Sequence, residues 1–200
     1  AVEYGATFDI SNDSSTQKVV VNFVDEDNSI VGEEAFMNPA NSKEFTLGYY
    51  LSKDLGIYDL DVGFRHDQIE RSGSVTEEEH GDHHDDHGDE HEDEHGEIDY
   101  YNIDDSTNSF AVTLGRSLAD NLGVSLGYAS VERLPSSIEL FMNGPHMATG
   151  RFEVGDPNLN SETSNNFDIT LNFDNGDFYA SASFYVTDVD NYIALIDEED

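Results

Sequence analysis

Six of the eight histidines of this 200-residue chain lie within one segment, residues 77–97. The segment reads EEEHGDHHDDHGDEHEDEHGE, so its other residues are carboxylates and glycines. Its candidate metal ligands are His80, His83, His84, His87, His91, His95, Asp82 and Asp86. Neutral imidazole suits zinc, copper and nickel, whereas carboxylates alone suit calcium or magnesium. The segment therefore predicts binding of a transition metal, with Zn²⁺ as the first expectation and Ni²⁺ or Cu²⁺ as alternatives.

Several of these histidines are four residues apart, as are His83 and His87. On a helix this spacing would place two imidazoles on one face, where they could chelate a metal ion. Glycines and repulsion between the carboxylates oppose a stable helix without metal. We therefore expect a capture surface with partly redundant ligands that orders on binding, not a closed four-ligand site. The alternative is a solvated acidic spacer, although a spacer needs no histidine.

Composition narrows the classes of function. The formal net charge is −36, which excludes nucleic acid as a partner and favours cations such as metal ions. There is no cysteine, so thiolate metal sites are excluded. No enzyme is expected, because no nucleophilic triad can be argued and the HExxH string at 91–95 has no apolar helix face to position it. The sequence contains no apolar run of about 18 residues, so no membrane-spanning helix is expected.

The rest of the chain alternates between apolar and polar residues, which predicts β-strands. We expect eight of them, at residues 4–10, 19–24, 45–52, 58–71, 110–114, 122–129, 167–173 and 178–186. Short turns are expected at 11–16, 53–56, 119–121 and 174–177, and long loops at 25–42, 72–106 and 133–166. In an antiparallel up-and-down meander, this regular exchange of short and long connections places every long loop at one end. That asymmetry is typical of a transmembrane β-barrel, with a soluble antiparallel sandwich as the alternative.

The last long loop has the most distinctive sequence. Residues 132–169 read ERLPSSIELFMNGPHMATGRFEVGDPNLNSETSNNFDI, which resembles the late-barrel signature of TonB-dependent outer-membrane receptors. The resemblance is specific over residues 130–193 and looser over 17–71. The NGPH variant, the earlier GEEAF run and the histidine-rich segment between them are most similar to the zinc-uptake branch of that family.

This resemblance implies a 22-stranded transmembrane barrel with an N-terminal plug, driven by TonB. No plug is seen in this sequence, so residues 1–200 are expected to form part of a single barrel domain, an all-β arc of about eight strands. The implied partners are a metal ion, the TonB complex through the missing plug region, and outer-membrane lipid. The implied location is the outer membrane of a Gram-negative cell, with the histidine-rich segment outside.

Two ligand candidates lie outside the histidine-rich segment. His146 follows Pro145 in the signature loop, which by resemblance folds toward the barrel mouth, and Glu34 lies in the GEEAF run beside Glu33. His66, next to Asp67, is a further candidate. The expected function is zinc capture and import; the alternatives are a haem or siderophore receptor on the same scaffold and a soluble, secreted metal-sequestering β-domain.

We predict a structural role, not metal binding, for three carboxylates of the signature loop (residues 133–166). We expect Glu139, Glu153 and Asp156 to order that loop by capping turns.

Overall fold

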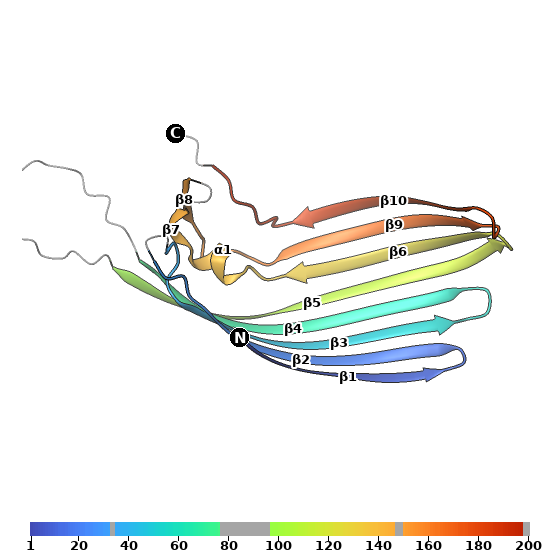
Figure 1. Ribbon diagram of the computed structural model, residues 1–200, viewed down its shortest axis with the longest axis horizontal. Helices are drawn as coiled ribbons and strands as arrows, with labels where there is room; N and C mark the ends of the chain where they lie inside the picture. Colours follow the sequence, from blue (N-terminus) through green and yellow to red (C-terminus); the bar gives the residue numbers. More distant parts are fainter. Residues whose placement is uncertain (33–34, 77–96, 147–149, 198–200) are drawn as a thin grey trace, which may run out of the picture.

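The computed structural model describes residues 1–32, 35–76, 97–146 and 150–197. Eight strands form one antiparallel sheet in the order β1-β2-β3-β4-β5-β6-β9-β10, so the predicted all-β meander is confirmed (Figure 1). The strands are β1 (Val2–Asn12), β2 (Ser15–Asn28), β3 (Ala40–Asp54), β4 (Asp59–Thr76), β5 (Ile98–Ala119), β6 (Leu122–Arg133), β9 (Glu162–Asp174) and β10 (Tyr179–Asp190). The chain between β6 and β9 adds helix α1 (Ser137–Phe141) and a small hairpin of β7 (Asn143–His146) and β8 (Arg151–Val154).

The sheet has two chemically different faces, because side chains alternate along every strand. Strand register places Phe64 between Tyr49 and Phe110 on one face, which we call the apolar face. Arg65 lies between Gly48 and Ser109 on the opposite, polar face. The large side chains of the apolar face remain exposed, Phe64 by 43%. A wall with an apolar face toward lipid and a polar face toward the lumen has this pattern.

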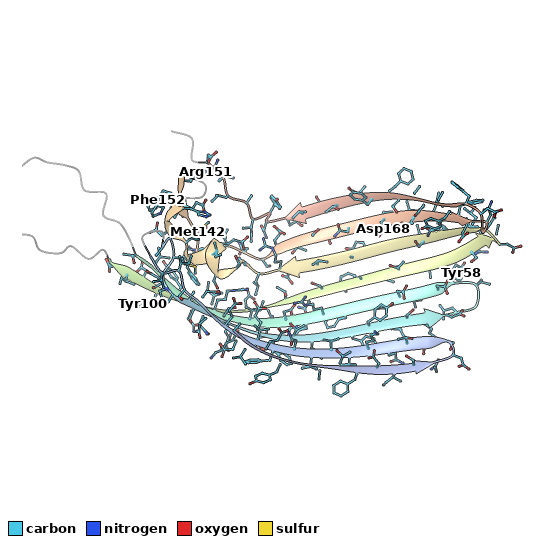
Figure 2. All side chains as sticks on the ribbon, viewed as in Figure 1. Tyr58, Tyr100, Met142, Arg151, Phe152 and Asp168 are labelled. Atoms are coloured by element: carbon cyan, nitrogen blue, oxygen red, sulfur yellow. The ribbon has the colours of Figure 1, made fainter. Side chains whose placement is uncertain are left out.

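The described parts of the long connections lie at one end of the sheet, as the alternation of loop lengths predicts. Figure 1 shows the tight turns between paired strands at one end and α1, β7 and β8 at the other. Two tight turns use a glycine with positive φ, 88° at Gly56 and 87° at Gly176, a backbone region that glycine enters without steric cost. In Figure 2, Tyr58 marks the short-turn end, and Met142 and Arg151 mark the loop end.

The strands are longer than the sequence predicts. The expected loop over 72–106 is shortened, because β4 continues to Thr76 and β5 begins at Ile98. Beyond Phe64 the apolar face carries polar residues such as Gln68. Hydrophobic alternation therefore stops there, while the hydrogen-bonded pairing of the two strands goes on.

The other two long loops also differ from their predicted bounds. The connection over 25–42 is reduced to residues 29–39, because β2 and β3 both extend into it. The connection over 133–166 is not a simple loop: it contains α1 and the β7–β8 hairpin, and β9 already begins at Glu162. Among the described residues, no helix is long and apolar enough to cross a membrane.

A small hydrophobic core lies at the loop end, on the polar face of the sheet. Its buried members are Met37, Ala40, Leu140 and Phe141. Phe141 is completely buried, and a Cβ built on Gly73 of β4 would lie 2.5 Å from its ring. The signature loop thus packs directly onto the extended part of β4.

Candidate functional site

His146, the last residue of β7, is a predicted metal ligand within the described part of the chain. Its Nδ1 lies 2.9 Å from Oε2 of Glu153, and its side chain is 33% exposed. The imidazole also stacks on the ring of Phe36, with centroids 4.9 Å apart and planes inclined by 27°. Two independent contacts therefore fix the position and the plane of this ring.

The hairpin of β7 and β8 brings His146 and Glu153 together. His146 pairs with Arg151, and Gly144 pairs with Glu153, so all four residues share one face of the hairpin. His146 and Glu153 are diagonal neighbours on that face, within reach of a long side chain. Glu153 is only 7% exposed, so the contact is made away from bulk solvent.

The hairpin interlocks with the connection between β2 and β3. The backbone amide of Asn143 donates to the carbonyl of Phe36 at 2.7 Å, and Met37 and Met142 form an isolated antiparallel bridge. Gly144 packs against Phe36 so closely that a Cβ there would lie 2.8 Å from the Phe36 Cα. Phe36, on which His146 stacks, is therefore held by backbone contacts to β7, the strand that carries His146.

The same hairpin also holds the end of β4, where the chain enters the histidine-rich segment. The Asn143 side-chain amide donates to the Thr76 carbonyl at 2.6 Å. Asn38 donates to the Thr76 hydroxyl at 3.0 Å and to Ser74. The strand that leads into residues 77–97 is thus bonded to the strand that carries His146.

Helix α1 is fixed to the barrel wall by charged groups. Arg133, at the end of β6, donates to Glu139 at 2.8 Å and lies 3.5 Å from the Glu162 carboxylate at the start of β9. Ser136 and Glu139 form a capping box at the start of the helix. Burial acts to raise the pKa of Glu139, but hydrogen bonds from Arg133 and Ser136 outweigh it and hold the pKa below its ordinary value.

Most of the predicted ligands lie outside the described residues. These are His80, His83, His84, His87, His91, His95, Asp82, Asp86, Glu33 and Glu34. Within the ranges that the structure describes, no group of three or more histidine or carboxylate side chains could hold a metal ion. His146 and Glu153 are therefore at most part of a ligand set, and the assignment of the other ligands stays a prediction.

The remaining predictions for single residues have mixed outcomes. His66 and Asp67 are not brought together: His66 contacts Asn108, while Asp67 is bonded to Arg65 on the polar face. Glu139 caps a helix, as described above. Asp156 accepts from the Asn158 backbone amide and so orders its turn.

The capping role predicted for Glu153 is replaced by its contact with His146. No sequence motif marks this contact, because it depends on the register of a hairpin that the sequence analysis did not predict.

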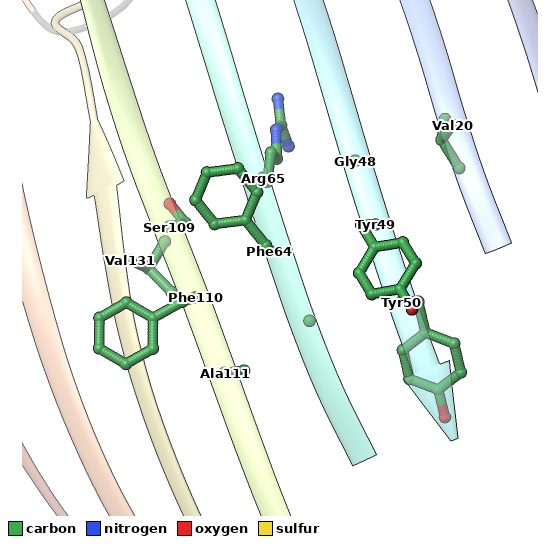
Figure 3. Close-up of a pocket in the computed structure, with 11 residues that line it drawn as sticks. Val20, Gly48, Tyr49, Tyr50, Phe64, Arg65, Ser109, Phe110, Ala111 and Val131 are labelled. Carbon is green, nitrogen blue, oxygen red and sulfur yellow. The ribbon is translucent and has the colours of Figure 1, made fainter. Parts of the chain in front are cut away.

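A separate hollow of about 280 Å³ lies on the wall between β2 and β6 (Figure 3). Its lining includes the small residues Gly48, Gly63 and Ala111. Its lining includes Arg65 but no histidine or carboxylate, so it offers no metal ligands.

The comparison with known families settles the class of protein. The family model of the TonB-dependent receptor-like β-barrel matches residues 2–199. The chain belongs to this family. Family membership places the protein among outer-membrane receptors, which favours the transmembrane barrel over the soluble sandwich.

Solved structures of such receptors share the fold. The haemophore receptor HasR of Serratia marcescens, solved with its haemophore HasA and haem, is 17% identical with a TM-score of 0.64 over 95% of this chain and 32% of its own. The copper transporter OprC is 18% identical with a TM-score of 0.61, over 94% and 30%. The ferric-catecholate receptor Fiu of E. coli K12 is 14% identical with a TM-score of 0.57, also over 94% and 30%. This TonB-dependent receptor chain thus spans about a third of the length of each, and at these identities the similarity concerns the fold alone.

Proposed function

We propose that this chain is the barrel segment of a receptor that captures a transition metal at the cell surface and imports it, with zinc as the cargo. The observation that carries the proposal is the set of contacts that hold His146 in place. Its imidazole is held by Glu153 and Phe36 in interlocked loops, and the strand that bears it is bonded to the end of β4. A histidine that served only as a surface residue would need none of these contacts.

The proposal assigns two roles to two groups of ligands. Residues 77–97 gather dilute Zn²⁺ through redundant imidazoles and carboxylates. His146 belongs to a more central site that receives the metal, together with Glu34 of the GEEAF run. Glu34 precedes Phe36 by two residues, so the run that carries this carboxylate also carries the ring on which His146 stacks. Import requires the plug and the TonB complex, both implied by family membership.

The test uses the intact receptor as the only zinc receptor of a cell, with uptake of radioactive zinc measured at limiting metal. His146→Ala should reduce import strongly, because it removes a ligand of the central site. Replacing all six histidines of residues 77–97 by Asn should raise the zinc concentration for half-maximal uptake and leave uptake at saturating zinc nearly intact. Capture should also weaken below about pH 6, since free imidazole has a pKa near 6.5.

His66→Gln is the matched control. His66 contacts Asn108 on the barrel wall, away from the interlocked loops, so its replacement should leave zinc uptake unchanged. The proposal fails if His146→Ala imports zinc like the wild type. It also fails if the wild-type receptor imports haem or a ferric siderophore and not zinc, which would favour the alternative cargoes.

A further inference from the structure

Glu153 is a buried carboxylate whose position the hairpin register determines. It alternates with Phe152 and Val154, which are 52% and 60% exposed, whereas Glu153 is 7% exposed. It lies opposite Gly144, whose lack of a side chain lets the hairpin pack closely against Phe36. Burying an ionised carboxylate is costly unless it is hydrogen-bonded. The contact with His146 is one such bond.

This contact has a chemical consequence for His146. An ionised carboxylate can only accept hydrogen bonds, so the 2.9 Å contact requires a proton on Nδ1. In the neutral imidazole the lone pair then lies on Nε2, the nitrogen at the far side of the ring. The same bond holds the ring in the orientation from which Nε2 can bind a metal ion.

Phe36 restricts the ring in a second way. The stack on Phe36, with the two planes inclined by 27°, fixes the plane of the imidazole. A 180° flip would keep this plane but would break the contact of Nδ1 with Glu153. The Phe36 backbone is in turn bonded to Asn143. The direction in which Nε2 points is therefore fixed before any metal arrives.

We propose that Glu153 is a positioning residue of the metal site: through its bond to Nδ1 it holds His146 in the tautomer and orientation that present Nε2 to the metal. This inference rests on the proposed function of His146. It assigns to Glu153 a role in affinity that is separate from any role in holding the hairpin together. Loss of such a partner lowers metal affinity by about 10- to 100-fold.

The experiment measures zinc affinity by calorimetry with the intact receptor, purified in detergent. All six histidines of residues 77–97 are replaced by Asn in the background, so that the central site is measured alone. The variants are Glu153→Gln, Glu153→Ala, His146→Ala and the double variant His146→Ala/Glu153→Ala. Asp156→Asn is the matched control, because it removes one carboxylate charge three residues away that contacts Asn158 and not His146.

Both Glu153 variants should weaken zinc binding, Glu153→Ala by about 10- to 100-fold and Glu153→Gln by less, since its amide oxygen still accepts from Nδ1. The double variant should bind no more weakly than His146→Ala alone, because Glu153 acts through His146. Asp156→Asn should change affinity less than twofold.

The inference is overturned if the losses add in the double variant, or if Glu153→Ala binds zinc like the wild type while His146→Ala does not. Hydrogen exchange of β7 and β8 separates a positioning role from unfolding: in Glu153→Gln it should match the wild type, and faster exchange that accounts for the lost affinity would assign a structural role. If His146→Ala leaves zinc affinity unchanged, the proposed function fails instead.

Discussion

Gly144→Ala should separate the two interlocked loops that position His146. A Cβ at residue 144 would lie 2.8 Å from the Phe36 Cα and 3.3 Å from its Cβ. The nearest atom belongs to backbone, so no side-chain rotation can relieve the contact. The Phe36 backbone is held by the 2.7 Å bond from the Asn143 amide and by the neighbouring bridge of Met37 and Met142.

The free-energy cost of Gly144→Ala follows from the distance by which Phe36 must move away. Ordinary contact begins near 3.4 Å, so Phe36 must retreat by about 0.6 Å, the difference between 3.4 and 2.8 Å. Overpacking of this kind costs about 1–3 kcal/mol. If that cost falls on the interlock, local opening becomes about 5- to 150-fold more frequent, at 1.4 kcal/mol for each factor of ten.

Hydrogen–deuterium exchange of the intact receptor measures this opening directly, because the Asn143 amide is the donor to Phe36. Its exchange should accelerate by the stated factor, and zinc affinity should fall with it. Gly63→Ala is the control, since nothing lies within 4 Å of a Cβ at that position on the sheet. Unchanged exchange at Asn143 in Gly144→Ala would refute the view that Phe36 and β7 are rigidly interlocked.

Two further predictions concern the packing of α1. Phe141→Ala removes a fully buried ring and should destabilise the loop-end core by about 3–5 kcal/mol, seen as faster hydrogen exchange in α1; Ile138→Ala, at a position 47% exposed, should have little effect. Glu139 has a lowered pKa, so the folded loop takes up its proton less readily than the unfolded one. Its stabilising contribution is then complete above the ordinary value of 4.5 and is lost as the pH falls through the lower, folded value. Proteolysis of the loop from pH 6 down to pH 3 should show this loss, and Glu139→Gln should reduce the pH dependence.

The wall of the barrel could be predicted because its two faces meet different surroundings. Each strand is apolar on one face and polar on the other over the stretch represented by Phe64 and Arg65, and period-two alternation reports that contrast. The alternation of short and long connections then gave the orientation of the loops. These are local properties of the sequence, so they can be predicted without knowledge of tertiary contacts.

The loop-end structure could not be predicted in the same way. The buried core joins residues from distant segments, such as Met37 and Leu140, and no periodic pattern links them. One signal was present: Ser136 followed by Glu139 is a capping box, and it precedes the apolar pair Leu140 and Phe141. Read as a helix start, it would have predicted α1.

The prediction of His146 as a ligand rested on the family resemblance, whereas its partner Glu153 depended on geometry. The contact exists because β7 and β8 pair with Gly144 opposite Glu153. A four-residue strand containing a proline carries little strand propensity of its own. Its pairing is stabilised by packing on Phe36, which the local sequence does not reveal.

The extension of β4 and β5 bears most directly on function. Ten residues along β5 separate Phe110, on the apolar face, from Tyr100, which corresponds to about 34 Å of paired strand at 3.4 Å per residue. Hydrophobic alternation on this face ends near Phe110, whereas the pairing of β4 with β5 continues to Thr76 and Ile98, so the sequence pattern does not mark the limit of the sheet. The histidine-rich segment is thus joined to the end of a long, hydrogen-bonded hairpin. At the end of that hairpin, Thr76 is bonded to the strand that carries His146, which places the start of the histidine-rich segment beside the proposed central site.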